Sequence, residues 1–327
     1  MLCAVSFRVR DFVGVVVCTL APLVALAQTY PVKPVRIVTG FAPGGSTDVI
    51  ARLVGSKLAE LLGQPFVIEH RPGAATAIAA ERVASSPPDG YTLLLIAAST
   101  TSQSALRKKA LPYDLENGFA HISMLAAGPF VLLVHPSVPA RDVKALIALA
   151  RAQPGKLNVG SPGVGSVNHL AALLFNHRAK LNMTYVAYKG SAEAVVAVAS
   201  GQIDLSFPSV PAALPLMAQQ RVRALAVTSA QRVPVIKDVP TVAEAALPGY
   251  EYSGALGLSA PAGTPREIVA RLNASIVKVV NTPETRDAIS KIGFEAQTSS
   301  AEQYAAFIKE DIAKIAAAVA AAGLKAE

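Results

Sequence analysis

Cysteine is almost absent from this chain. Only two of its 327 residues are cysteines, Cys3 and Cys18, and both lie near the N-terminus. Because the segment that holds them is typical of a cleaved signal peptide, the mature chain would contain no cysteine. This excludes a disulfide-stapled scaffold, a thiol nucleophile and a cysteine metal site.

The first 27 residues have the pattern of a secretory signal peptide. Arg8 and Arg10 form a basic start, residues 12–26 are almost wholly apolar, and Ala25-Leu26-Ala27 is a small-residue cleavage site. We therefore predict cleavage after Ala27. No later apolar run reaches the length of a membrane span, so the sequence predicts export without an anchor, to the bacterial periplasm.

Catalytic motifs are also missing. The chain has no G-x-S-x-G, H-E-x-x-H, phosphate-binding G-K-[ST] or complete G-x-G-x-x-G motif. Its five histidines do not have the spacing of metal ligands. We therefore expect no catalysis, no metal and no cofactor. A Ser-His-Asp triad assembled from scattered residues would make the chain an exported hydrolase, but no motif points to one.

Clusters of charge are rare. The net charge is +8, yet the basic residues are scattered singly, and only Arg107-Lys108-Lys109 forms a run, which a solvated loop explains. We therefore expect no nucleic-acid partner. With 52% hydrophobic and 16% charged residues, the chain is predicted to be well cored. The 300 or so residues after the signal segment are enough for two domains.

Strand-like and helix-like segments alternate through most of the remaining chain, which predicts an α/β fold with largely parallel sheets. The expected strands are 34–40, 65–69, 91–97, 130–135, 157–161, 183–188, 202–207 and 223–228, and the expected helices are 46–62, 74–85, 141–152, 165–178 and 190–200. The pattern changes after Gly254. Two amphipathic helices, at 265–281 and around 304–315, follow without strands between them and are expected to pack on an existing sheet.

The segment Phe41–Asp48 (FAPGGSTD) lies between an apolar strand and an amphipathic helix. Gly44 and Gly45 allow a tight turn and a close approach to a ligand. The first turn of the helix offers unpaired N–H groups and a positive dipole end, and Ser46 and Thr47 add hydroxyls. The pattern predicts a site for a small anion, with Asp48 in a structural role because its charge would repel a carboxylate.

A second segment repeats this arrangement. A strand at 157–161 is followed by the turn SPGVGS, Ser161–Ser166, and a helix that begins near Val167. Ligands of open α/β sheets bind beyond the carboxyl ends of strands, at helix starts. Two such ends facing each other would hold a solute from both sides. His169, one turn into this helix, is expected to be a packing or solvent-exposed residue.

At this point the chain resembles a family, the Bug or TctC-type extracytoplasmic solute receptors. The resemblance covers residues 30 to about 265 in the family's order. It rests on YPVKPVRIV from Tyr30, FAPGGSTD from Phe41, RPGA from Arg71, PDGYTLLL from Pro88, LPYD from Leu111, GVGS from Gly163, YKGS from Tyr188, GQID from Gly201, VPTVAE from Val239 and APAGTP from Ala260.

The resemblance implies a two-lobed periplasmic binding protein, type II-like, that closes on its ligand like a flytrap, with a parallel-rich sheet in each lobe. One lobe would comprise residues 28–129 plus 254–327, and the other residues 130–253. The ligand would be a small carboxylate: a di- or tricarboxylate, an acidic amino acid or an aromatic acid. The partner would be a tripartite tricarboxylate-type permease or, alternatively, a membrane sensor protein. We expect a monomer.

Carried over by position, the resemblance implies two ligand-binding loops and two further contributions. The first loop comprises Phe41, Ala42, Gly44, Gly45, Ser46 and Thr47, and the second comprises Ser161, Gly163, Gly165 and Ser166. Asp204 would follow a strand entering the cleft and orient a ligand amine or a water. The hydroxyls of Ser99 and Thr100, after the third strand, would reach the cleft.

The sequence departs from the family pattern in places that bear on ligand identity. The usual NRPGAGG becomes His70-Arg-Pro-Gly-Ala-Ala-Thr76, a stiffer and bulkier turn whose methyl groups would reshape the ligand wall. Pro208 stands where an acidic residue is common. A customary tryptophan is missing near Ala255, and the whole chain has none.

Overall fold

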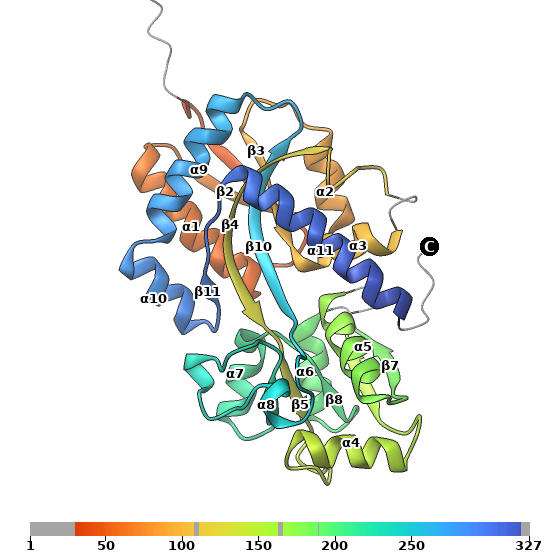
Figure 1. The fold of residues 1–327 in the computed structure, drawn as a ribbon. Helices are drawn as coiled ribbons and strands as arrows, with labels where there is room; N and C mark the ends of the chain where they lie inside the picture. The colour runs from red at the N-terminus through yellow and green to blue at the C-terminus, as the bar shows by residue number, and fades with distance from the viewer. Residues whose placement is uncertain (1–29, 108–110, 163–165, 189, 322–327) are drawn as a thin grey trace, which may run out of the picture.

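The computed structural model describes residues 30–107, 111–162, 166–188 and 190–321. The predicted signal peptide and its cleavage site lie outside these ranges, as do Gly163 and Gly165. The described chain forms two lobes, each built around its own β-sheet (Figure 1). No helix within these ranges is both long and apolar enough to span a membrane.

The first lobe is built on a six-stranded sheet in the order β11-β4-β10-β3-β1-β2. The strands are β1 (Val35–Thr39), β2 (Phe66–His70), β3 (Thr92–Ala97), β4 (Phe119–Pro129), β10 (Ser253–Pro261) and β11 (Glu295–Ala296). β1 pairs in parallel with β2 and β3, whereas β10 is antiparallel to β3 and β4. The carboxyl ends of β1, β2 and β3 therefore lie at one edge of the sheet.

Helices cover both faces of this sheet. They are α1 (Ser46–Leu62), α2 (Ala77–Ala84), α3 (Ala98–Arg107), α9 (Arg266–Val280), α10 (Pro283–Lys291) and α11 (Ala301–Ala321), with a 3-10 turn at Ala74–Thr76. Successive strand side chains point to opposite faces. Accordingly, Ile37 packs with α1 and α9, and its neighbour Val38 packs with α2 and α11 on the other face.

The second lobe is built on a five-stranded sheet in the order β7-β6-β8-β5-β9. The strands are β5 (Val131–Val134), β6 (Asn158–Ser161), β7 (Thr184–Ala187), β8 (Leu205–Ser206) and β9 (Arg223–Val227). The helices are α4 (Val143–Ala152), α5 (Val167–Ala179), α6 (Ser191–Ala199), α7 (Val210–Ala218) and α8 (Val242–Ala245), with a 3-10 turn at Pro234–Ile236. β6 is parallel to β7 and β8, and β5 is antiparallel to β8 and β9.

Two chain crossings join the lobes side by side. β4 ends at Pro129 and leads directly into β5, and β10 begins at Ser253, which pairs with Pro129. The N–H of Phe130 donates to Thr228 Oγ1 at 2.8 Å, and the Thr228 hydroxyl donates to the carbonyl of Tyr252 at 2.6 Å. These bonds fasten the two crossings to each other.

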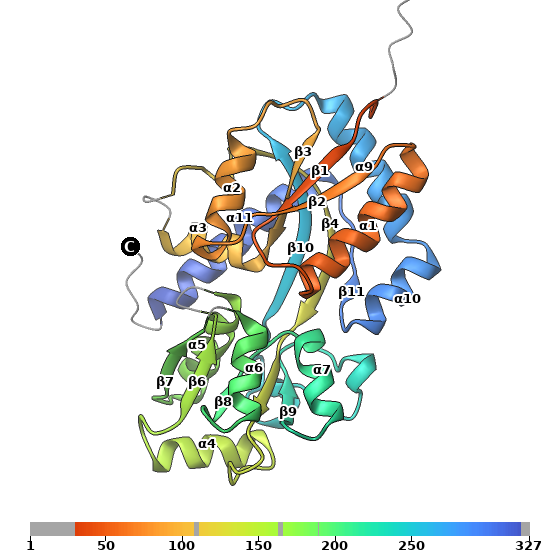
Figure 2. The same cartoon turned by 180° about the vertical axis from the view of Figure 1, so that it is seen from behind.

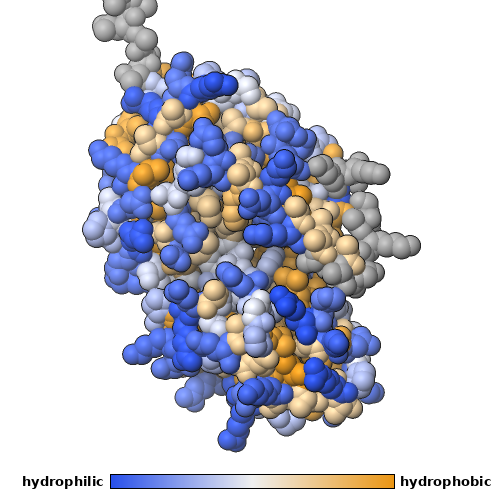
Figure 3. Space-filling model, viewed as in Figure 1, coloured by the Kyte–Doolittle hydropathy of each residue, from blue (hydrophilic) through white to orange (hydrophobic). Residues whose placement is uncertain are grey.

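A small apolar cluster also joins the lobes. Leu170 of α5 packs with Ile315 and Val319 of α11, and all three side chains are almost fully buried. Beside this contact, a groove of about 1210 Å³ is lined by residues of both lobes, among them Leu170 of the second lobe and Ile315 of the first. Figure 3 shows the hollow between the lobes on this face.

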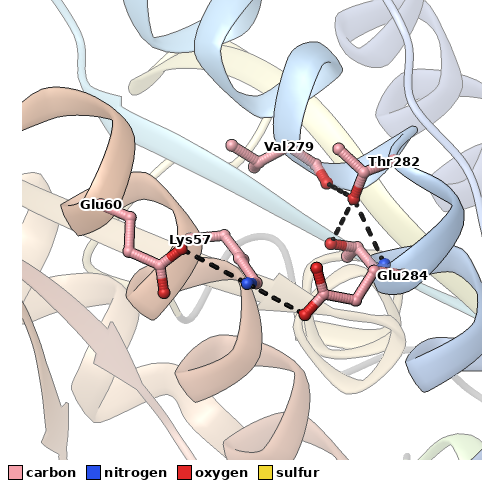
Figure 4. Close-up of polar contacts among 6 residues, drawn as sticks. Lys57, Glu60, Val279, Thr282 and Glu284 are labelled. Atoms are coloured by element: carbon pink, nitrogen blue, oxygen red, sulfur yellow. Dashed lines mark hydrogen bonds and ion pairs between the residues drawn. The ribbon is translucent and has the colours of Figure 1, made fainter.

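A polar contact fastens α10 to α1 (Figure 4). Lys57 Nζ of α1 lies 3.3 Å from Glu60 Oε2 and 3.1 Å from Glu284 Oε1 at the start of α10. Thr282 caps α10, since its hydroxyl oxygen accepts the N–H of Thr285 at 3.3 Å. The start of α10 is therefore held both by its own cap and by α1.

Several expectations about the elements are corrected. β4 and β10 were not among the predicted strands, and both sheets are mixed because β4, β5, β10 and β11 contribute antiparallel pairings. The expectation that no strand separates the C-terminal helices is wrong, because β11 lies between α10 and α11 and pairs with β4. α3 follows β3 without a break and was not among the predicted helices.

Candidate functional site

The candidate site lies where the parallel strands of the first lobe end. Thr39, His70 and Ala97 terminate β1, β2 and β3. Residues 40–45 connect β1 to α1, and Figure 2 shows this connection on the side of the first lobe that faces the second. In the second lobe, β6 ends at Ser161 before α5. These are the positions at which open α/β sheets bind ligands.

The glycines of the first loop have different roles. Gly44 has a φ of +88°, a left-handed backbone conformation that residues other than glycine rarely adopt. Gly45 precedes α1 with φ −81° and ψ 170°, and no side chain caps the helix there. A Cβ on Gly45 would meet no atom within 4 Å. The fold therefore needs glycine at position 44, whereas position 45 leaves open space beside the unpaired N–H groups of the first turn of α1.

Asp48 holds the loop rather than a ligand. Its Oδ2 accepts the N–H of Gly44 at 3.0 Å, and its Oδ1 lies 2.9 Å from Arg52 Nε and 3.2 Å from His70 Nε2. Burial alone would raise the pKa of this carboxyl, but the hydrogen bonds from Arg52 and Gly44, with the nearby charge of Arg52, lower it overall. The structural role expected for Asp48 is confirmed.

The segment after β2 supports the same loop. His70 Nδ1 lies 2.9 Å from the carbonyl oxygen of Phe41, and the N–H of Arg71 donates to the carbonyl of Thr39 at 2.8 Å. Phe41 is half-buried, and Ala42 is exposed beside it. In the sequence His70 stands out only as a departure from a family pattern. Its contact with Phe41 was not predicted, because the two residues are 29 positions apart.

Ser99 and Thr100 lie in the first turn of α3 and are almost fully buried. Thr100 Oγ1 accepts the N–H of Ala97 at 3.3 Å and the hydroxyl of Thr76 at 3.0 Å. The Thr100 hydroxyl is thus engaged inside the first lobe, next to the end of β3. Both residues follow the third strand directly, and the contact between Thr100 and Thr76 was not predicted from the sequence. That the two hydroxyls reach the cleft stays a prediction.

Ser46 and Thr47 are the first two residues of α1. Thr47 is buried and Ser46 is partly exposed, so the two hydroxyls of the first loop differ in accessibility.

In the second lobe, Ser161 is buried at the end of β6 and Ser166 caps α5. The Ser166 hydroxyl oxygen accepts the N–H of His169 at 3.2 Å. His169 itself is buried edge-on against Tyr185, with ring centroids 4.7 Å apart. Burial lowers its pKa to about 4, so the imidazole is neutral near pH 7. The packing role expected for His169 is confirmed.

One polar residue near this loop was missed from the sequence. The Asn168 side chain donates to the carbonyl of Phe207 at 2.7 Å and accepts the hydroxyl of Ser191 at 3.2 Å. Ser191 is the first residue of α6. Asn168 therefore brings the starts of α5 and α6 together beside the end of β8.

Asp204 lies at the other end of the second sheet. It precedes β8 instead of following a strand. Its Oδ2 accepts the N–H of Asn158 at 2.7 Å, and its carbonyl accepts the N–H of His135 at 2.8 Å. Because Asn158 begins β6 and Ser161 ends it, Asp204 lies at the end of the sheet away from Ser161, and the expectation that it follows a strand entering the cleft is wrong. β8 is only two residues long and starts after Asp204.

The groove between the lobes is a separate feature. Its lining includes Met124, Arg232, Tyr252, Phe294 and Ile315 but none of the residues predicted from the sequence to bind a ligand. Across the described ranges, no three His, Cys, Asp or Glu side chains are grouped so that they could hold a metal ion.

Comparison with known proteins covers nearly the whole chain. Residues 50–324 match the family model described as the tripartite tricarboxylate transporter family receptor. Protein BugT of Bordetella pertussis (strain Tohama I) is 33% identical over 300 residues, which are 91% of this chain and 92% of that protein. The protein encoded in the tcbD–tcbE intergenic region of Pseudomonas sp. (strain P51) is 36% identical over 285 residues, 87% of this chain and 84% of that protein.

Solved structures agree with these relatives. An R. palustris protein solved with adipate superposes with a TM-score of 0.86 at 35% identity, covering 90% of this chain and 99% of that one. MatC from Rhodopseudomonas palustris with bound malate superposes with a TM-score of 0.81 at 33% identity. The match covers 89% of this chain and 100% of that one. The periplasmic binding protein BugD superposes with a TM-score of 0.83 at 28% identity, and the match covers 90% of this chain and 99% of that one. The two-lobed fold implied by the sequence resemblance is confirmed.

Proposed function

Because the chain belongs to the tripartite tricarboxylate transporter receptor family, we propose that it captures a small carboxylate in the periplasm, between its two lobes. The lobes comprise residues 28–129 with 254–327, and residues 130–253. Ligand-binding proteins of this architecture close by rotation about a few hinge residues. The paired crossings at Pro129–Phe130 and Tyr252–Ser253 supply such a hinge.

The observation that carries this proposal is the geometry at Gly45. Its backbone has no strain that calls for glycine, and a Cβ would meet nothing within 4 Å. It lies beside the N–H groups that begin α1, where the helix dipole favours a negative charge. A carboxylate fits this open position without any cationic side chain.

In the bound state, a carboxylate group replaces water at the start of α1, with Ser46 and Thr47 beside it and Phe41 and Ala42 as the wall. The second lobe contributes the segment from Ser161 to Ser166, including Gly163 and Gly165, at the start of α5. Asn168 and Ser191 hold the starts of α5 and α6 together, which keeps this half of the site in shape.

Dicarboxylates are the proposed ligand class. The solved neighbours contain adipate and malate, which are both dicarboxylates. Two helix starts, one in each lobe, suit a ligand with a negative group at each end. The net charge of +8 also favours the approach of anionic solutes, although salt screens this effect.

The mature protein works as a monomer without catalysis, and it passes its ligand to a tripartite tricarboxylate-type permease. Deletion of the gene is expected to abolish uptake of the ligand. Loss of induction with uptake intact would instead assign the protein to a membrane sensor.

The direct test is thermal unfolding of the mature chain, starting at Gln28, with malate, succinate, adipate and their uncharged dimethyl esters. A ligand at 100 times its Kd stabilises the folded state by about 2.7 kcal/mol. We expect the free acids to raise the Tm and the esters to leave it unchanged. Equal shifts by acids and esters, or a response only to sugars or cations, would overturn the proposal.

A further inference from the structure

Thr76 has an unusual backbone conformation for a β-branched residue. Its φ is +83° and its ψ is −6°, in the left-handed region. Threonine adopts this region rarely, at a cost in free energy. Thr76 also stands at the N-cap of α2 without forming the side-chain cap that threonine usually supplies there. Neither its backbone nor its capping preference explains a threonine at this position.

The Thr76 side chain instead contacts two parts of the candidate site. Its hydroxyl donates to Thr100 Oγ1 at 3.0 Å, in the first turn of α3. Its Cβ and methyl carbon lie against Gly40, so closely that a Cβ on Gly40 would come within 2.5 Å of the Thr76 Cβ. Thr76 and Thr100 are 3% and 0% exposed, so this contact is fully packed.

These contacts connect the ends of two neighbouring strands. Gly40 follows β1 and precedes Phe41, and Thr100 follows β3. Thr100 also accepts the N–H of Ala97, the last residue of β3. The Thr76 side chain therefore fixes the distance between the main chain that enters the first loop and the first turn of α3.

We propose that Thr76 is a positioning residue for ligand selection: it sets the spacing of Gly40–Phe41 from α3 and so determines which length of dicarboxylate the site accepts. This inference rests on the proposed carboxylate-binding function. Glycine at position 76 would relieve the backbone strain but leave space beside Gly40, so the loop would settle closer to α2. The affinity for a ligand selected by its length is sensitive to that shift.

The test compares Thr76→Gly, Thr76→Ser and Thr76→Val by calorimetric titration with malonate, succinate and adipate. Thr76→Ser keeps the hydroxyl, so its Kd values should stay within about twofold of the parent protein. Thr76→Val keeps the shape of the side chain but loses the hydrogen bond to Thr100. This loss is expected to raise the Kd of the best ligand about fivefold. Thr76→Gly should raise the Kd of the best ligand about tenfold and reduce the difference in affinity between short and long diacids.

Lys180→Gly is the matched control. Lys180 also has a left-handed backbone, with φ +52°, but it is exposed at the C-terminal end of α5. Glycine there should leave every Kd unchanged.

The outcomes separate this inference from the function on which it rests. If the parent protein binds none of the three diacids and malate does not raise its Tm, the proposed function fails. If the parent binds, and Thr76→Gly binds the same diacids with the same affinities and order, the positioning role is overturned. Should Thr76→Gly fail to fold, equal affinities of Thr76→Val and Thr76→Ser would overturn it instead.

Discussion

The Thr101 hydroxyl donates a 2.6 Å hydrogen bond to Oδ2 of Asp311, a residue 210 positions later in the chain. The bond joins α3, which follows directly from β3, to the last helix, α11. Burial raises the pKa of the Asp311 carboxyl, although the bond from Thr101 and the charge of Lys314 partly offset this. The last helix therefore anchors the helix that carries Ser99 and Thr100.

The first prediction is that the stability of Asp311→Asn, relative to that of the parent protein, increases as the pH rises. A carboxyl with a raised pKa in the folded state binds its proton more tightly there than in the unfolded chain. Ionisation therefore costs stability as the pH rises above the ordinary range for aspartate. The asparagine amide oxygen still accepts from Thr101 and never ionises. The Tm difference between variant and parent should shift in favour of the variant between pH 4 and pH 8.

Asp287→Asn serves as its control, because Asp287 is exposed and pairs with Lys291 on the same helix. A Tm difference for Asp311→Asn that is independent of pH would contradict the buried, partly compensated carboxyl described above.

The second prediction has the opposite sign and concerns Asp48→Asn. The pKa of Asp48 is lowered, since the hydrogen bonds from Arg52 and Gly44 outweigh the effect of burial. The stability from this carboxylate is therefore present above the ordinary aspartate range and is lost as the pH falls below it. The variant should lose about 1 kcal/mol at pH 7. In denaturant titrations the difference in unfolding free energy between the variant and the parent should shrink toward pH 3. A difference that stays constant with pH would refute the charge-based role.

Many elements of both lobes were predictable because their segments follow simple patterns. α1 was predicted at the bounds observed, since its apolar residues repeat at helical spacing up to the left-handed Gly63 that ends it. The paired strand–turn–helix segments were visible because their glycines and serines stand between periodic stretches. The structure places both at carboxyl ends of strands.

The missed elements have physical reasons. α3, with the sequence ASTTSQSALR, has a polar composition typical of a loop, yet it is buried because its hydroxyls bond internally, as Ser102 does to the carbonyl of Ala98 at 2.7 Å. β10 contains Gly254 and Gly257, which weaken a strand signal. Gly257 is needed where the Tyr304 ring and the Ser123 carbonyl press on the backbone. Contacts of this kind, far apart in sequence, leave no local pattern.

The third prediction separates the capping role of Ser166 from its role in binding. Ser166→Ala removes the acceptor for the N–H of His169, which should cost about 1 kcal/mol of stability. Thr282→Ala removes an equivalent cap from α10, remote from the candidate site, and should cost a similar amount. Only Ser166→Ala is expected to weaken carboxylate binding, by about threefold in a calorimetric titration. Equal Kd values for the two variants would remove Ser166 from the site.

The fourth prediction is that Gly45→Val damages binding and not folding. The φ and ψ of Gly45 suit valine, and an added Cβ would meet no protein atom within 4 Å. The Tm of the unliganded variant should therefore stay within about 2 °C of the parent value. The branched side chain occupies the position from which a carboxylate reaches the N–H groups of α1, so the affinity should fall by at least about tenfold.

Ser46→Ala completes this experiment. It removes one hydroxyl but leaves the main-chain donors in place, so its loss of affinity should be smaller than that of Gly45→Val. If Gly45→Val bound dicarboxylates as tightly as the parent, the ligand would have to sit elsewhere, because no carboxylate contacts the start of α1 with a valine in its path. If Ser46→Ala lost more affinity than Gly45→Val, the hydroxyl and not the helix start would be the main contact.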